Sequence, residues 1–115
     1  WKSYCRSKLL NIYFTYEFNR RLNTKIICNS VHPGFVNSNF GNNDSSYFRS
    51  VAKISKKIFG ISTEKAAKRI VVLCENNFSN VTGKYFSKKQ MISSSKISYD
   101  KKISSYIWDA SLKYI

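Results

Sequence analysis

The chain begins with a long segment that lacks helix-breaking residues and continues into a short apolar segment that stops at its single proline. Residues 3–22 contain no Gly or Pro, and large apolar side chains recur at every fourth position, at Leu10, Phe14, Phe18 and Leu22. This spacing places them on one face of an α-helix. Residues 25–31 are rich in β-branched side chains and are followed by Pro33-Gly34, which predicts a short buried strand. A helix followed closely by a strand is typical of α/β folds.

The remainder of the chain continues this mixture of helices and strands. We expect a loop over residues 35–46, a helix over 47–59, a helix over 62–76, a strand over 84–86 and a final helix from about Tyr99. Ser62 opens the third helix, and Ile103, Ile107 and Leu112 are expected to face inward from the last one. The order helix, strand, helix, helix, strand, helix predicts part of a parallel α/β sheet whose strands are joined by helical crossovers.

Length and composition limit the class of protein. With 115 residues the chain provides one domain at most, and 43% hydrophobic residues are too many for a disordered polycation. The formal charge of +14 and the pI of about 9.9 raise the question of nucleic-acid binding. The basic residues, however, are scattered in ones and twos, without a helix-turn-helix, RRM or zinc pattern. We therefore interpret the charge as a solvated surface and expect no specific nucleic-acid partner, with a basic nucleic-acid-binding module as the remote alternative.

Cysteine and histidine usage argues against a metal centre or a disulfide framework. The chain has Cys5, Cys28 and Cys74, no CxxC pair and only one histidine, so we predict no metal site. Each cysteine lies in or beside an apolar stretch, which is typical of buried free thiols and fits a reducing compartment. The chain contains no run of 18 apolar residues, so we predict no membrane span. Because position 1 is Trp and the only methionine is Met91, we expect that the chain does not start at an unprocessed initiation site.

The residues with the clearest chemical potential stand at the start of the chain. Tyr4 and Lys8 are four residues apart, which places a phenol and an ammonium on one face of the same helix. A phenol has a reference pKa of ~10, and a fixed positive charge beside it favours the phenolate and lowers that pKa. Tyr4 would then exchange a proton with an alcohol or carbonyl oxygen. The pair alone is a weak signal, because Tyr and Lys are both abundant in this chain.

Two further segments give the Tyr–Lys pair a context. Residues 4–11 read YCRSKLLN, residues 31–38 read VHPGFVNS and residues 81–86 read VTGKYF. The first is similar to the Y-x-x-S-K active-site helix of short-chain dehydrogenase/reductases and the second to the H-P-G-x-V-x-T loop that follows strand six in that family. The third resembles the V-T-G-K-Y-F segment at strand seven of its retinol dehydrogenase-like members. The resemblance extends over essentially the whole chain, including Trp108, which matches an aromatic position in that subgroup's last helix.

The resemblance implies an α/β fold, namely the C-terminal half of a Rossmann-like doubly wound parallel sheet with two parallel strands and their helices. Residues 1–115 would form the C-terminal portion of a single NAD(P)-binding domain whose cofactor-binding N-terminal half is absent. The four glycines of the chain are too far apart to form a G-x-G-x-x-G loop. We therefore expect these residues to be an incomplete fold and incapable of catalysis alone.

The resemblance also assigns roles to individual residues. Tyr4 corresponds to the catalytic acid/base, and Lys8 corresponds to the residue that binds the nicotinamide ribose and lowers the tyrosine pKa. The implied cofactor-binding residues are Tyr4, Lys8, Pro33, Gly34, Val36 and Ser38. Ser38 replaces the usual Thr of the family and keeps its hydroxyl. By contrast, we interpret His32 as structural and Thr82-Gly83 as a turn.

The function implied by the resemblance is an NAD(P)-dependent oxidoreductase that interconverts an alcohol and a carbonyl, of which this chain is a part. The subgroup favours NADP over NAD and an apolar, retinoid-like substrate, for which Phe40, Tyr47 and Phe48 offer apolar surface. The family also implies a homodimer through the first helix. A reducing location, either the cytoplasm or the cytosolic face of a membrane, fits the free cysteines, and these residues do not decide membrane association. A truncated, non-catalytic product of such a gene is the alternative.

Overall fold

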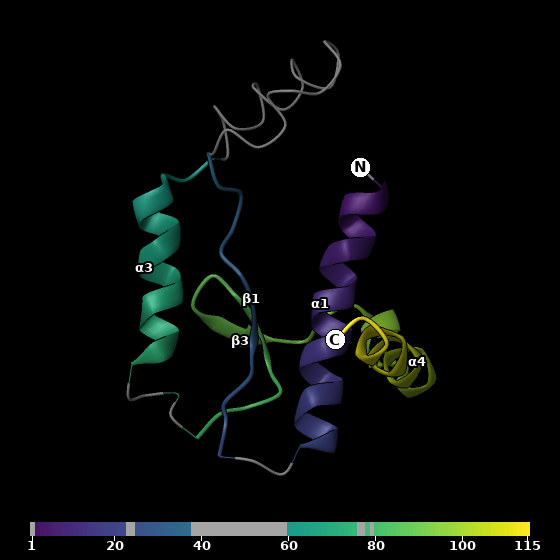
Figure 1. Ribbon diagram of the computed structural model, residues 1–115. Coiled ribbons are helices and arrows are strands. Elements are labelled where there is room, and N and C mark those ends of the chain that lie inside the picture. Colours follow the sequence, from purple (N-terminus) through teal and green to yellow (C-terminus); the bar gives the residue numbers. More distant parts are fainter. Residues whose placement is uncertain (1, 23–24, 38–59, 76–77, 79) are drawn as a thin grey trace.

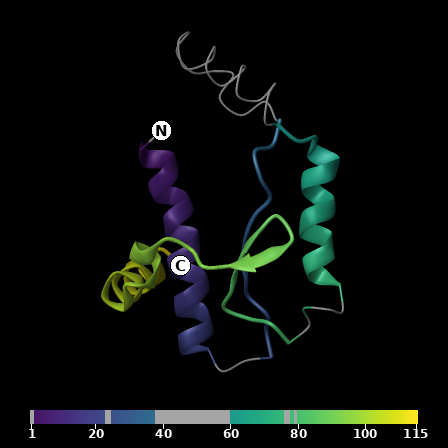
Figure 2. The same cartoon turned by 180° about the vertical axis from the view of Figure 1, so that it is seen from behind.

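The computed structural model describes residues 2–22, 25–37, 60–75, 78 and 80–115 of the chain. In chain order the described elements are α1 (Lys2–Arg21), β1 (Ser30–His32), α3 (Thr63–Cys74), β2 (Tyr85–Ser87), β3 (Gln90–Ile92), the 3₁₀ helix η2 (Lys96–Tyr99) and α4 (Lys101–Leu112). The strands lie between helices, with α3 on one side and α1 and α4 on the other (Figures 1 and 2). The predicted helix over 47–59 and most of the loop before it lie outside the described residues.

The described strands form one mixed sheet in the order β1-β2-β3. β1 and β2 run parallel, with Ser30 opposite Tyr85 and His32 opposite Ser87. β2 and β3 run antiparallel, with Tyr85 opposite Ile92. The connection between the parallel strands includes α3, which is the arrangement that the sequence predicted. The α/β fold class is therefore confirmed, and the small open sheet agrees with an incomplete Rossmann-like fold.

The hairpin between β2 and β3 is an element that the sequence did not reveal. Lys88 and Lys89 form its turn, and Lys88 adopts a positive φ of 60°. Tight hairpin turns favour Asn-Gly or Asp-Gly, because Gly and Asn reach positive φ at little steric cost. A Lys-Lys turn lacks that signal, so we expected only a loop after the second strand. The Lys88 N–H also donates to the His32 carbonyl at 2.8 Å, which extends the contact between β1 and the hairpin.

The predicted buried strand over residues 25–31 is shorter and more exposed than expected. Only Ser30–His32 joins the sheet, and the Ile26 and Ile27 side chains are 60% and 47% exposed. A run of β-branched residues is buried on both faces only where helices and neighbouring strands cover it. No described element covers these two isoleucines to that extent, so the burial prediction was wrong for them.

The helices α1 and α3 agree with the helices that the sequence predicted over residues 3–22 and 62–76. Ser62 is the N-cap of α3, and its Oγ accepts a hydrogen bond from the Lys65 N–H at 3.2 Å. Arg20 and Arg21 occupy the last turn of α1, where positive charge complements the helix dipole. Among the described residues, no helix is long and apolar enough to cross a membrane.

The final helix begins after a separate 3₁₀ turn, because Asp100 caps it. The Asp100 carboxylate accepts hydrogen bonds from the N–H groups of Lys102 at 2.9 Å and Ile103 at 3.1 Å. The predicted start at about Tyr99 falls in η2, two residues before α4. This small shift follows from a cap that lies at the junction of two short helices.

The face of α4 that meets α1 differs in part from the prediction. Ile103 and Leu112 are 38% and 54% exposed, so the expectation that they face inward was wrong. Ser104 is buried instead, and the Trp108 ring stacks on Phe14 of α1 with ring centroids 5.3 Å apart. A buried hydroxyl and an aromatic ring are prominent in this contact, so the apolar periodicity of α4 did not identify its inner face.

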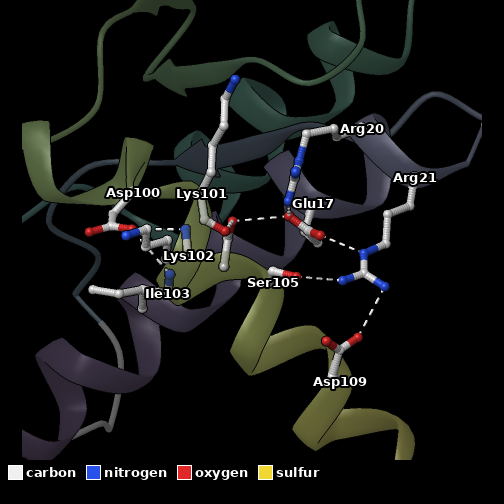
Figure 3. Close-up of polar contacts among 10 residues, drawn as sticks. Glu17, Arg20, Arg21, Asp100, Lys101, Lys102, Ile103, Ser105 and Asp109 are labelled. Atoms are coloured by element: carbon white, nitrogen blue, oxygen red, sulfur yellow. Dashed lines mark hydrogen bonds and ion pairs between the residues drawn. The ribbon is translucent and has the colours of Figure 1, made fainter.

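The contact between α1 and α4 centres on the buried carboxylate of Glu17 (Figure 3). Arg20 and Arg21 of the same helix donate to this carboxylate, and the Ser104 hydroxyl of α4 donates to it at 3.0 Å. Arg21 also pairs with Asp109 of α4 at 3.0 Å. A buried charge is tolerated only when it is paired and hydrogen-bonded. These five residues, the Glu17 cluster, therefore attach α4 to α1 in a specific register.

Burial and hydrogen bonding act on the Glu17 carboxyl in opposite directions. Burial alone would raise its pKa, but hydrogen bonds from Arg20, Arg21 and Ser104 outweigh burial and hold the pKa below its ordinary value. A carboxyl group with a depressed pKa stabilises the folded state at pH values above its unfolded pKa. That stabilisation is lost as the pH falls through the folded-state pKa.

The apolar core of the described residues is small. Its buried hydrophobic side chains are Tyr13, Ala66 and Phe86. Phe86, on β2, packs edge to face against Phe78 with centroids 5.2 Å apart. The Tyr13 hydroxyl donates to the Ile97 carbonyl at 2.7 Å, which satisfies its polar end. Burial of these apolar side chains and the paired polar groups of the Glu17 cluster together hold the described elements against one another.

The cysteines are less buried than expected. Cys5 and Cys74 are exposed, and Cys28 is partly exposed. Cys5 lies in the first turns of α1 and Cys74 at the end of α3, where the described elements leave the helix surface open. The inference from neighbouring apolar residues to buried thiols was therefore wrong for these two positions.

Replacing Glu17 by Gln is expected to lower the free energy of unfolding of a full-length version by about 2–3 kcal/mol at neutral pH. The neutral amide does not balance the charges of the two arginines, and because both arginines are partly exposed the loss is smaller than for a fully buried broken pair. Chemical denaturation measures the difference, with the exposed Glu75→Gln as the control. The loss should shrink as the pH falls below 4.5, the ordinary glutamate value. Equal stability of wild type and Glu17→Gln would contradict the role of the cluster.

Candidate active site

Three segments lie at the same end of the fold, with the start of α1 and the start of α3 on opposite sides of the C-terminal end of β1 (Figures 1 and 2). The chain direction explains this arrangement, since α1 runs away from that end, β1 returns to it and α3 runs away again. In open α/β sheets, ligands bind outside the carboxyl ends of the strands. This end of the structure is therefore the candidate site, and it carries the predicted residues Tyr4 and Gly34.

The Tyr4 and Lys8 side chains meet on one face of α1. The Lys8 Nζ lies 5.3 Å from the centroid of the Tyr4 ring, which is within cation–π range. Tyr4 is 36% exposed and Lys8 is exposed, so both groups are accessible to a ligand. The Ser7 hydroxyl between them donates to the Tyr4 carbonyl at 2.7 Å and is thus engaged within the helix. The structure brings together the phenol and the ammonium that the spacing predicted.

The segment after β1 is held in place by α3 and by Ile61, which lies just before α3. The Arg69 guanidinium of α3 donates to the Pro33 carbonyl at 2.5 Å. Gly34 has a φ of +107°, and a Cβ at this position would lie 2.5 Å from Arg69 Nη1. Val36 forms a parallel bridge with Ile61, just before α3. The backbone at the end of β1 is therefore fixed by one ion-dipole contact and one strand-like bridge.

The two groups of predicted site residues share an end of the fold but belong to different elements. The Tyr–Lys pair comes from α1, whereas residues 33–36 follow β1. The remaining predicted site and substrate residues lie outside the described residues; they are Ser38, Phe40, Tyr47 and Phe48.

The other residues singled out in the sequence have structural contacts. The Thr82 Oγ1 accepts a hydrogen bond from the Cys28 N–H at 3.0 Å, and the Gly83 N–H donates to the Cys28 carbonyl at 2.9 Å. Gly83 also has a positive φ of 66°. This turn connects the approach to β1 with the approach to β2, in agreement with the turn interpretation. His32 is exposed at the end of β1, and its described contact is the carbonyl bond to Lys88.

Sequence reasoning missed Arg69 and Ile61 at this end of the fold. Arg69 is one of several basic residues on α3, and only the folded chain shows that it reaches the Pro33 carbonyl. Ile61 pairs with Val36 across a segment of the chain, which local periodicity does not reveal. Glu17, by contrast, has a sequence signal, because it stands three and four residues before Arg20 and Arg21.

The chemistry available at this end is that of a phenol, an ammonium, a guanidinium and backbone groups. Lys8 offers three N–H donors, and the Tyr4 hydroxyl can donate or accept a hydrogen bond. Among the described residues, no group of three or more His, Cys, Asp or Glu side chains is placed to hold a metal ion. The arrangement suits proton exchange with an oxygen atom, next to a positive charge that favours an oxyanion.

Known short-chain dehydrogenases are similar to this chain over almost its whole length. Retinol dehydrogenase 14 of Mus musculus is 32% identical over 96% of the chain, and its Homo sapiens counterpart is 31% identical over the same share. The short-chain dehydrogenase TIC 32 A, chloroplastic, of Brassica napus is 27% identical over 99% of the chain. These matches cover 35%, 34% and 37% of the relatives, so the chain spans about a third of their length. No protein-family model matches the chain.

Replacing Gly34 by Ala is expected to cost a full-length version about 1–3 kcal/mol of stability, because the left-handed backbone and the nearby guanidinium both oppose a Cβ. Chemical denaturation measures the loss, with Asn37→Ala in the same segment as the control. The double variant Gly34→Ala/Arg69→Ala should recover part of the loss by removing the steric conflict. A Gly34→Ala variant as stable as the control would show that this backbone geometry is not required.

Proposed function

The chain belongs to the short-chain dehydrogenase/reductase family, and from this premise we propose that it contributes the proton-transfer residues of an NAD(P)-dependent oxidoreductase that interconverts an alcohol and a carbonyl. The observation that carries the proposal is the pairing of Tyr4 with Lys8 at the end of the fold where β1 ends. Relatives named retinol dehydrogenase and short-chain dehydrogenase support it. The proposal concerns the whole protein, of which this chain corresponds to a part.

Tyr4 is the proposed acid/base. In carbonyl reduction its hydroxyl gives a proton to the oxygen that becomes the alcohol, and in the reverse direction the phenolate takes that proton back. The Lys8 ammonium lies 5.3 Å from the centroid of the Tyr4 ring, so a positive charge stands beside the proposed acid/base. Both side chains come from one helix face, so their separation does not depend on a loop.

The residues at this end fit a nicotinamide cofactor, which supplies or accepts the hydride when bound. The fit rests on the chemistry of the donors: Lys8 carries three N–H groups suited to ribose hydroxyls, and the backbone after β1 is fixed by Arg69. The residues that would hold the cofactor are Tyr4, Lys8, Pro33, Gly34, Val36 and Ser38. We propose NADP rather than NAD on the resemblance to the retinol dehydrogenase-like subgroup.

The proposed substrate is an apolar alcohol or its carbonyl counterpart. Phe35 follows Gly34 at the candidate site and is 43% exposed, so it offers apolar surface there. Further aromatic residues of the same loop lie outside the described residues. The Mus musculus relative carries a name that specifies retinol, which is an apolar alcohol. We therefore favour a retinoid-like ligand over a sugar or a small polar metabolite.

We also propose that the whole protein forms a homodimer through α1. Leu10 and Phe14 belong to the apolar stripe of this helix and are 44% and 45% exposed, although the Phe14 ring also stacks on Trp108 of α4. Apolar side chains gathered on one exposed face favour association with another surface. The proposal extends the sequence resemblance, and no nucleic-acid partner is proposed.

A reducing location is the proposed environment of the protein. Cys5, Cys28 and Cys74 are all free, and two of them are exposed. Exposed thiols persist more readily where reductants keep them reduced. The cytoplasm and the cytosolic face of a membrane both satisfy this condition.

The central test is Tyr4→Phe in a full-length version of the protein. This change removes the proton donor and keeps the ring, so turnover of an apolar alcohol with NADP should fall below detection while the other proposed cofactor contacts keep most of the cofactor affinity. Turnover is followed by the absorbance of the reduced nicotinamide, and cofactor binding by fluorescence quenching. Tyr106→Phe, a change in an exposed tyrosine of α4, is the matched control. Substantial turnover by Tyr4→Phe would reject the assigned role.

A second prediction concerns the 115 residues on their own. In the described sheet β1 is an edge strand, and few apolar side chains of the described residues are buried. A larger domain would pair this edge and cover these side chains. We expect this chain alone to melt without a cooperative transition and to reduce no carbonyl with NADPH. Calorimetry and an absorbance assay measure both properties. A sharp transition together with activity would reject the requirement for further chain.

The truncated, non-catalytic alternative makes a different prediction about the gene. An intact upstream coding sequence with a glycine-rich loop would reject this alternative, because that loop binds the pyrophosphate of a dinucleotide. An interrupted upstream sequence would favour it.

A further inference from the structure

A pocket of about 240 Å³ lies beside the second half of α1, away from the candidate active site. α1, the turn before β2, η2 and the first turn of α4 surround it. The residues that line it are Tyr16, Asn19, Arg20, Gly83, Ser98, Tyr99, Lys101 and Ser104. Tyr16 is 12 residues from Tyr4 on the same helix, which corresponds to about 18 Å along the helix axis. The pocket is therefore separate from the Tyr–Lys pair.

The charged groups of the pocket have one sign. Among the described residues that line it, Arg20 and Lys101 carry positive charges and none carries a carboxylate. Arg20 donates to Glu17, but a guanidinium has five N–H donors and the Arg20 side chain is 45% exposed. Figure 3 shows the Arg20 and Lys101 side chains extending from α1 and from the start of α4. Two cations from different elements thus border one pocket.

Aromatic rings and hydroxyl groups form another part of the wall. The Tyr16 and Tyr99 rings are stacked with centroids 5.2 Å apart, and the Tyr16 and Ser94 hydroxyls are 2.7 Å apart. The Ser94 N–H donates to the Tyr99 hydroxyl at 3.2 Å, and Ser94 and Ser98 are joined at 2.5 Å. This hydrogen-bonded arrangement fixes the rings on the pocket wall. Tyr99 is 52% exposed, so part of its ring is open to a ligand.

The pKa values of the two phenols shift in opposite directions. Hydrogen bonds with Ser94 and Tyr16 lower the pKa of Tyr99 to about 8, and burial raises the pKa of Tyr16. At a pH well below 8 the Tyr99 hydroxyl therefore adds no negative charge that would oppose an anion.

The size of the pocket restricts its ligand. The pocket volume is about 240 Å³. This is smaller than the pockets of ~300–1,000 Å³ that bind drug-sized ligands. The space suits a single small ring with one charged substituent.

We propose that this pocket binds a small organic anion, a carboxylate on a planar apolar ring, with the carboxylate between Arg20 and Lys101 and the ring against Tyr99. Charge-assisted hydrogen bonds supply the specificity for the anion, and ring contact supplies the apolar part of the affinity. The proposal does not depend on the oxidoreductase function, since the pocket shares no residue with the Tyr–Lys pair.

Benzoate is the probe, and its binding to a full-length version is measured by isothermal titration calorimetry at a pH well below 8. Lys101→Gln should weaken binding about tenfold, because one charge-assisted contact is lost. Lys102→Gln, a neighbouring exposed change outside the pocket lining, should stay within about twofold of wild type. Lys101→Arg should restore most of the affinity by restoring the charge.

Three results would overturn the proposal. Equal weakening by Lys101→Gln and Lys102→Gln would indicate attraction to the general positive surface. Benzyl alcohol binding as tightly as benzoate would show that the charge is not recognised. Absence of benzoate binding to the wild-type protein would reject the site directly. Tyr4→Phe should leave benzoate binding unchanged, which separates this test from the test of the proposed oxidoreductase function.

Discussion

A single buried carboxylate determines how α1 lies against the rest of the structure. Glu17 is fully buried and receives hydrogen bonds from two arginines of its own helix and from Ser104 of α4. Because buried charges need hydrogen-bond partners, the bond from Ser104 and the Arg21–Asp109 pair favour one docking position of α4 on α1. α1 is one continuous helix of 20 residues, so fixing its second half also fixes the rotation of its first half. Tyr4 and Lys8 stand in that first half, where nearly every side chain is exposed.

The parallel pairing of β1 and β2 gives the fold two chemically different ends. The carboxyl end of β1 and the start of α1 lie at the same end of the fold, which carries the phenol, the ammonium and the fixed backbone after β1. The other part of α1 carries the Glu17 cluster and the pocket bordered by Arg20 and Lys101. Arg20 belongs to both the cluster and the pocket lining. The groups that orient α1 and the groups proposed to bind an anion are therefore physically connected, while the Tyr–Lys pair lies several helical turns away.

The sequence predicted those elements whose signals are local. The uninterrupted apolar spacing predicted α1, and the cap at Ser62 predicted the start of α3. Tyr4 and Lys8 meet because their spacing on a helix is enough to bring them together. Other features depend on contacts between distant residues, such as the bond from Arg69 to the Pro33 carbonyl, and no local pattern encodes them. The β2–β3 hairpin was missed because Lys88 adopts a positive φ without the usual Gly or Asn.

The wrong burial prediction for residues 25–31 has a physical cause. Ile26 and Ile27 are exposed before β1. Parallel sheets are stable when both faces and their edges are covered, so apolar residues at these places are what a longer doubly wound sheet would bury. Covering a few hundred Å² at ~25 cal/mol per Å² contributes about 5–10 kcal/mol, which is comparable to the whole stability of a typical domain. The position of the Tyr–Lys pair on α1 is thus set locally, but the stability that keeps α1 in place depends on how much of that apolar surface is covered.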